Sequence, residues 1–144
     1  MGIKDIFGFQ PQSKASVPLF TMSVGAGNFN PVEDDIAQNV DLNEFLVERP
    51  LATFFVRING DGMAKAGICD SDLLIIDTAI EPVDAKIVLA KLNGHLTIRI
   101  FRNFNGSIYL ETAEEHFLPL KIEDYMEFDI IGVATKVIHS FDVN

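Results

Sequence analysis

Two Asn-Gly dipeptides, Asn93-Gly94 and Asn105-Gly106, constrain the fold of this chain more than any other feature. Asn-Gly favours the positive backbone angles of a two-residue type I′ turn, which joins neighbouring antiparallel strands. The first turn separates residues 86–92 from residues 96–102, and both segments are rich in β-branched and apolar side chains. The second turn leads into residues 107–111, which have the same character. The two turns therefore predict a meander of three antiparallel strands.

Further segments after residue 52 share this composition and are separated by turn residues. No long amphipathic helix interrupts them and no internal repeat is present, so the chain is expected to be a mainly antiparallel β domain. The six predicted strands are Thr53–Ile58, Asp72–Asp77, Lys86–Leu92, Leu96–Arg102, Ser107–Glu111 and Phe128–Ser140.

The N-terminal third has a different composition. Residues 1–17 mix Gly, Gln, Ser and Pro without helical or strand periodicity, which predicts a mobile arm that continues in extended form to residue 32. We therefore divide the chain into a flexible arm, residues 1–32, and a β domain, residues 33–144.

Two short helices are expected at the start of the β domain. Acidic residues favour a helix N-terminus, so Glu33–Asp35 would begin the first helix, and Ile36 and Val40 would share one of its faces. Asp41 is a suitable N-cap for the second helix, with Glu44 three residues later in a capping box.

Charge and hydropathy exclude several classes of partner. The 21 acidic residues exceed the 11 basic ones, and the net charge of −10 would repel a nucleic-acid backbone in the absence of a dense basic patch. Arg99 and Arg102 are expected to pair with carboxylates rather than with phosphate, so no direct DNA contact is predicted. No apolar run approaches the ~20 residues of a membrane span, and no signal-peptide pattern is present, which predicts a cytoplasmic protein without a membrane partner.

No metal site or cofactor is predicted. His95, His116 and His139 are far apart, without cysteine or carboxylate at ligand spacing. Asp70-Ser71-Asp72 is interpreted as a turn leading into a buried strand, because no glycine-spaced acidic loop of the calcium-binding type follows it. Cys69, the one cysteine, excludes an internal disulfide and is expected to be a small buried apolar residue.

Six motifs follow one another along the chain: Pro18-Leu19-Phe20, Asp41-Leu42-Asn43, Ala52–Val56, Gly60-Asp61-Gly62-Met63, Gly67–Asp77 and Asn93–Arg99. Between Pro18 and Val137, these motifs resemble, in collinear order, the LexA/UmuD-type self-cleaving serine peptidases. The resemblance covers more than three quarters of the chain and implies the antiparallel β domain of that family, with short N-terminal helices and an extended arm. The short segment before Pro18 is expected of the UmuD branch, which lacks a DNA-binding domain there.

The family's chemistry, as the resemblance implies it, uses a serine and a neutral lysine. The serine of a Gly-Asp-Ser-Met motif attacks a peptide bond in the protein's own arm, and the lysine accepts the hydroxyl proton. Here the serine position is Gly62, which has no side chain, and the lysine position is Arg99, whose guanidinium stays protonated. The resemblance therefore implies a peptidase fold that lacks both catalytic groups, and we expect no peptidase activity.

A replacement dyad is not expected. Ser71 matches a family turn position at the head of a strand. In the hairpin around Asn93-Gly94, Lys91 would face Leu96 and Val88 would face Arg99. Alternation along the strand then places Lys91 and Arg99 on opposite faces of the sheet.

The family's cleavage position corresponds to Ala26-Gly27. Small side chains allow an extended backbone to enter a narrow cleft, so the dipeptide is chemically suitable for cleavage. The alternative is that Gly25-Ala26-Gly27 is a flexible hinge, and both interpretations remain open. As a cleavage site without a catalyst, Ala26-Gly27 would be a vestige or would be cut in trans by an active relative.

The resemblance implies an accessory subunit of an error-prone translesion DNA polymerase in the SOS response, unable to cleave itself. Implied partners are a second copy of the chain, a Y-family polymerase subunit of the UmuC type and the RecA filament, with a mixed dimer with an active paralogue as a further possibility. The closing segment Phe128–Ser140, apolar on both faces, suits a core or a homodimer contact. The alternative is a peptidase with RecA-stimulated cleavage at Ala26-Gly27, whose dyad has been altered deliberately.

Overall fold

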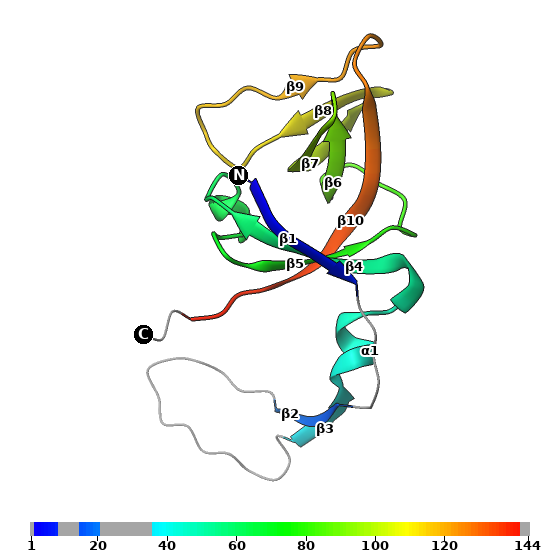
Figure 1. Ribbon diagram of the computed structural model, residues 1–144, viewed down its shortest axis with the longest axis vertical. Helices are drawn as coiled ribbons and strands as arrows, with labels where there is room; N and C mark the ends of the chain where they lie inside the picture. The colour runs from blue at the N-terminus through cyan, green and yellow to red at the C-terminus, as the bar shows by residue number, and fades with distance from the viewer. Residues whose placement is uncertain (1, 9–14, 21–35, 142–144) are drawn as a thin grey trace. The chain divides into compact units, whose positions relative to one another are not determined.

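The computed structural model describes residues 2–8, 15–20 and 36–141 (Figure 1). It is mainly β, and each pair of neighbouring strands is antiparallel, as the strand pattern predicted. The chain forms two compact units. One contains the first strand and the residues from Arg49 onward, and the other contains the segments between them. The predicted boundary between arm and β domain, at residue 32, lies outside the described residues.

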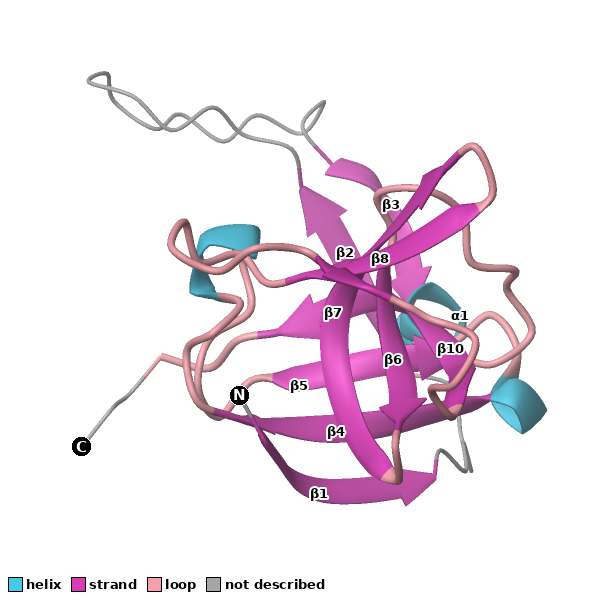
Figure 2. Cartoon of the chain, turned by 90° about the horizontal axis from the view of Figure 1, so that it is seen from above, coloured by secondary structure: helices cyan, strands magenta, loops and turns pink. Residues whose placement is uncertain are grey.

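The larger unit is one eight-stranded sheet in which the last long strand, β10, lies between β5 and β6. The sheet coils strongly, so that β4 and β5 cross the direction of β6 and β7 (Figure 2). In sheet order the strands are β1 (Gly2–Gly8), β4 (Thr53–Asn59), β5 (Leu73–Asp77), β10 (Phe128–Ile138), β6 (Ile87–Leu92), β7 (His95–Phe104), β8 (Ser107–Glu111) and β9 (Leu120–Lys121).

The hairpins form as the sequence predicts. Asn93 and Gly94 have φ values of 49° and 85°, and Asn105 and Gly106 have 52° and 89°, the positive angles that a type I′ turn requires. In the β6–β7 ladder Val88 pairs with Arg99 and Lys91 with Leu96, which confirms the predicted register.

Strand β1 is a departure from the prediction that the first residues lack strand structure. Gly2–Gly8 pairs with β4 at the edge of the large sheet. Its register shifts between Ile3 and Ile6, and such an irregularity breaks the two-residue alternation by which strands are found in sequence. Strand β1 therefore forms because its backbone pairs with β4, although its local sequence pattern does not indicate a strand.

The smaller unit contains strands β2 (Ser16–Phe20) and β3 (Ile36–Asp41) and helix α1 (Leu42–Leu46). The prediction of a first helix carrying Ile36 and Val40 is wrong, because this segment is strand β3, paired with β2. A spacing of four residues is also even, so it places two residues on one face of a strand as well as on one face of a helix.

The second predicted helix is present. Its N-cap is Asp41, whose carboxylate accepts a hydrogen bond from the backbone N–H of Asn43 at 3.0 Å. The same oxygen accepts from Ala15 N–H at 3.3 Å. One side chain thus begins helix α1 and ties it to the residue before β2.

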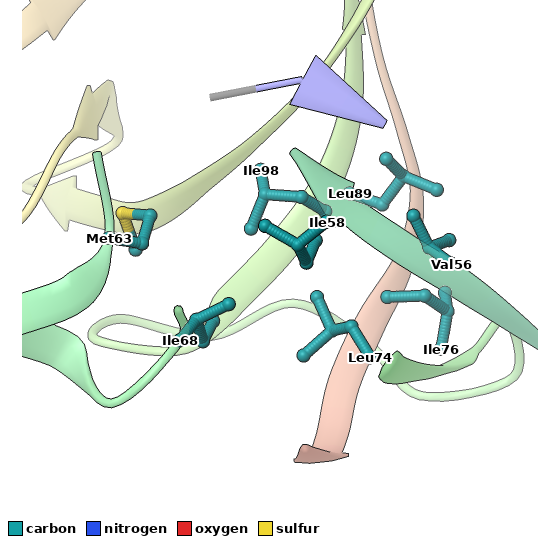
Figure 3. Packing of buried hydrophobic residues seen from close by; sticks show 8 residues of the cluster. All are labelled: Val56, Ile58, Met63, Ile68, Leu74, Ile76, Leu89 and Ile98. Atoms are coloured by element: carbon teal, nitrogen blue, oxygen red, sulfur yellow. The ribbon is translucent and has the colours of Figure 1, made fainter. Parts of the chain in front are cut away.

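The core of the larger unit has two parts, on opposite faces of strand β6. Leu89 belongs to the first cluster, whereas its neighbours Val88 and Ala90 belong to the second. Figure 3 shows the first cluster, in which side chains from β4 to β7 and from the loop after β4 meet. Its members are Val56, Ile58, Met63, Ile68, Leu74, Ile76, Leu89 and Ile98.

Candidate functional site

Gly62 lies in the tight loop that follows β4. The loop continues into a single 3-10 turn, Ala64–Ala66, which ends at Gly67 in the left-handed conformation. Two side chains brace it, since the Asp61 carboxylate accepts from Asp70 N–H at 3.0 Å and the Asp70 carboxylate accepts from Gly60 N–H at 2.6 Å. The position that the resemblance assigns to the family's serine is therefore held in a defined backbone conformation.

Arg99 lies near the middle of β7 and is partly buried. One guanidinium nitrogen donates a hydrogen bond to the carbonyl oxygen of Ile98 at 2.7 Å. Burial lowers the pKa of Arg99, and the nearby carboxylate of Glu114 opposes that shift by raising it. Burial at this position thus acts against a positive charge, and a lysine base requires surroundings that do so.

The hydrophobic core brings the neighbourhoods of these two positions together. Met63, which follows Gly62, is fully buried and belongs to the same cluster as Ile98, which precedes Arg99 (Figure 3). The cluster therefore anchors both the loop after β4 and the middle of β7.

The loop after β8 provides a second connection. Lys65, in the turn that follows Gly62, forms an ion pair of 2.9 Å with Glu115. The preceding residue, Glu114, is the one whose charge acts on Arg99. Two neighbouring residues of this loop, Glu114 and Glu115, thus link the surroundings of Arg99 to those of Gly62. Both side chains of the Lys65–Glu115 pair are mostly exposed, so the pair contributes little to stability and chiefly indicates proximity.

A pocket of about 420 Å³ adjoins Arg99. Its walls combine the guanidinium and polar side chains of β7 with apolar side chains of the neighbouring strands. Such a pocket suits an extended, partly apolar segment that presents a carbonyl or carboxylate oxygen to the cation. The lining residues are Leu92, Asn93, His95, Leu96, Thr97, Arg99, Leu110 and Leu120.

Neither residue considered as a replacement is suitably placed. The register of β6 and β7 puts Lys91 on the opposite face from Arg99, as predicted. Ser71 has a positive φ of 72°, which suits the family's usual glycine there, and its N–H donates to the carbonyl of Ile58. Arg102 pairs with Glu111 and Asp84, as expected for this arginine, whereas Arg99 donates its hydrogen bond to the backbone carbonyl of Ile98. Ala26-Gly27 lies outside the described residues and stays a prediction.

The structure assembles a group of side chains that the sequence analysis did not bring together. The sulfur of Cys69, a carboxylate oxygen of Asp72 and a ring nitrogen of His139 lie within 4.8 Å of one another. The signal for this group is strand pairing, because Leu73 of β5 lies opposite Ile138 of β10. Pairing the second predicted strand with the last one would have placed Asp72 beside His139.

The chain matches the family described as "Peptidase S24-like" over residues 18–135. Protein SamA of Salmonella typhimurium is 35% identical over 130 residues, which are 90% of each chain. Protein ImpA of Escherichia coli is 36% identical over 123 residues, 85% of this chain and 83% of that one. The LexA repressor of Colwellia psychrerythraea is 33% identical over 92 residues, 63% of this chain and 44% of the repressor.

The described part of the chain contains no helix with the length and apolar character needed to cross a bilayer. The matched residues 18–135 include the loop of Gly62 and the strand of Arg99. SamA and ImpA are UmuD-like SOS mutagenesis proteins, so the resemblance to the UmuD branch is confirmed. The chain belongs to the peptidase S24-like family.

Proposed function

We propose that this protein is a UmuD-like accessory subunit of a translesion DNA polymerase in the SOS response, and that it does not cleave itself. One observation carries the second half of the proposal. The loop and the strand that the resemblance assigns to the family's dyad are anchored in one core cluster, and the side chains at positions 62 and 99 are hydrogen and a guanidinium. Glycine supplies no nucleophile, and arginine stays protonated in proteins and accepts no proton.

The similarity to SamA and ImpA, which extends over most of each chain, supports the proposed accessory role. The proposed partners are a second copy of this chain, a Y-family polymerase subunit and the RecA filament in the cytoplasm. The abundant acidic residues and the pairing of Arg102 with two carboxylates support binding through protein surfaces rather than direct contact with DNA.

We predict that the purified protein is inert. Incubation with RecA, nucleotide and single-stranded DNA, or at alkaline pH, should leave the intact mass unchanged in a time course followed by mass spectrometry. Alkaline conditions promote the family's reaction by deprotonating a lysine, and Arg99 does not provide that route. An active LexA repressor in the same mixture serves as the positive control for the RecA filament. A fragment that begins at Gly27 would refute the proposed inertness.

The accessory role is tested separately by binding. The protein should co-purify with a co-expressed Y-family polymerase subunit and should sediment as a dimer by itself. Absence of polymerase binding would refute the accessory role, whether or not the protein binds RecA or forms a dimer. It would not affect the prediction of inertness.

A further inference from the structure

The three side chains of Cys69, Asp72 and His139 form a compact group at one end of the large sheet. Cys69 and Asp72 belong to the turn before β5, and His139 follows β10 directly. Thiol, carboxylate and imidazole are the three side-chain types that bind Zn²⁺ in proteins. Cys69 and Asp72 share the connection between β4 and β5 with Gly62, but none of the three residues lines the pocket beside Arg99.

The backbone holds this group in place. Leu73 pairs with Ile138, so the residues that precede and follow them, Asp72 and His139, emerge side by side. One oxygen of Asp72 accepts from Cys69 N–H at 2.8 Å, and the other lies 2.5 Å from His139 Nδ1. The backbone N–H of Asp72 donates to the carbonyl of Cys69 at 3.1 Å, which closes the turn. The side chains of Asp72 and His139 and the backbone of Cys69 are therefore positioned before any ligand binds.

Burial distinguishes this group from an ordinary acidic surface. Asp72 is 2% exposed, whereas His139 is half exposed. A buried carboxylate needs a cationic or hydrogen-bonding partner, and a metal ion supplies the strongest one. An exposed histidine provides the route by which an ion reaches the carboxylate.

We propose that Cys69, Asp72 and His139 bind a zinc ion. With metal–ligand distances of about 2.0–2.3 Å, tetrahedral ligand atoms stand roughly 3.2–3.8 Å apart. The present separations, up to 4.8 Å, lie close to that range, so small side-chain movements bring all three atoms to the ion. The hydrogen bond between His139 and Asp72 opens in that rearrangement, because both atoms then face the metal.

The fourth position of the ion adjoins a pocket of about 530 Å³. Asp72 and His139 both line it, together with Arg57 and Asp70. The Arg57 guanidinium donates a hydrogen bond to the carbonyl of Ser71 at 2.9 Å, so some of its N–H groups are already bonded to the protein. The pocket lining thus carries the two carboxylates of Asp70 and Asp72 and the one guanidinium of Arg57, so carboxylates outnumber guanidinium groups before the ion binds. Three protein ligands and one open position would admit a water molecule or a small anion.

Zinc bound here would join the end of β10 to the turn before β5. An ion that binds only the folded state stabilises it in proportion to the logarithm of its concentration over its dissociation constant. The proposed site therefore predicts a melting temperature that rises with zinc and falls again on addition of a chelator.

The first experiment uses Co²⁺ as a spectroscopic substitute for Zn²⁺ on the full-length protein. We expect one Co²⁺ per chain, with a thiolate-to-metal charge-transfer band and the intense visible bands of tetrahedral coordination, both abolished by Zn²⁺. Cys69 is the one cysteine of the sequence, so this thiolate band reports on the proposed site. Octahedral Co²⁺ without a charge-transfer band would overturn the proposal.

Matched variants locate the ligands. Cys69→Ser should abolish the charge-transfer band, and His139→Gln should weaken Zn²⁺ binding at least about 100-fold, because loss of an outer-shell partner alone costs about 10–100-fold. His95→Gln and His116→Gln, in histidines outside the group, should leave both signals unchanged. Both ligand variants avoid the buried Asp72, and circular dichroism checks that they are folded. Equal zinc affinity in the His139→Gln and His95→Gln variants would mean adventitious surface binding only and would overturn the proposal.

Discussion

The Gly62→Ser, Arg99→Lys double variant is expected to cut itself between Ala26 and Gly27. Serine restores an oxygen nucleophile, and lysine restores a base that becomes neutral when buried. Gly62 is not among the glycines with positive φ, so a serine side chain requires no unusual backbone conformation there. The cluster that contains Met63 and Ile98 already anchors the loop and the strand.

Either single variant should stay close to the background rate. A positioned general base contributes about 10²–10⁴-fold, and nucleophile and base act as one unit, so their effects are strongly non-additive. The double variant should therefore exceed each single variant by at least about 100-fold in a time course followed by mass spectrometry. Adding Ala26→Phe to the double variant should stop the reaction, because a bulky side chain obstructs entry to a narrow cleft.

The rate of the double variant should rise with pH, because only the neutral lysine accepts a proton. Burial lowers the pKa of a cation at position 99, and the Glu114 carboxylate raises it. Replacing Glu114 with Gln removes a charge that favours the protonated amine, so the pKa falls and the pH profile moves to lower pH. The movement should diminish in high salt, since Glu114 is exposed.

A folded double variant that remains uncut at alkaline pH would show that more than the two side chains separates this protein from an active peptidase. In that case the oxyanion donors or the dry surroundings of the lysine would also have been lost. Cleavage by the Gly62→Ser single variant at the rate of the double variant would instead identify a different base.

Gly132→Ala is expected to destabilise the protein by about 3 kcal/mol, at the upper end of the usual cost of overpacking. Gly132 lies in β10, where the strand bulges between its neighbours β5 and β6. A Cβ atom there would stand 2.5 Å from Cγ2 of Ile76 and 2.9 Å from the carbonyl oxygen of Asp77. This carbonyl belongs to the backbone of β5, which is paired with β10, so it can move away from the added Cβ only if the sheet shifts.

The measurement is chemical denaturation, or a melting curve in which we expect a fall of roughly 10 °C. Gly106→Ala is the matched control, because Gly106 has a φ of 89° and nothing within 4 Å of an added Cβ. It isolates the cost of the backbone angle, about 1–2 kcal/mol. A loss for Gly132→Ala that is no larger than the control's would contradict the packing argument.

The sequence by itself determined most of the large sheet. Short-range preferences decide these elements, since Asn-Gly selects the turn at Asn93-Gly94 and the turn fixes the register of Val88 with Arg99. Asp41 likewise marks the beginning of helix α1 through a hydrogen bond only two residues away. The family motifs assign Gly62 and Arg99 to the dyad positions because short motifs can be matched without knowledge of the fold, and that assignment stays a prediction.

Tertiary structure decided the elements whose hydrogen bonds come from distant strands. Gly2–Gly8 becomes a strand because β4 offers a free edge, and Ile36–Asp41 becomes a strand because β2 pairs with it. Neither segment has a local pattern that selects this state. The group of Cys69, Asp72 and His139 was hidden for the same reason, because 67 residues separate Asp72 from His139. Only the antiparallel pairing of β5 with β10 places them within bonding distance, and no local preference encodes that pairing.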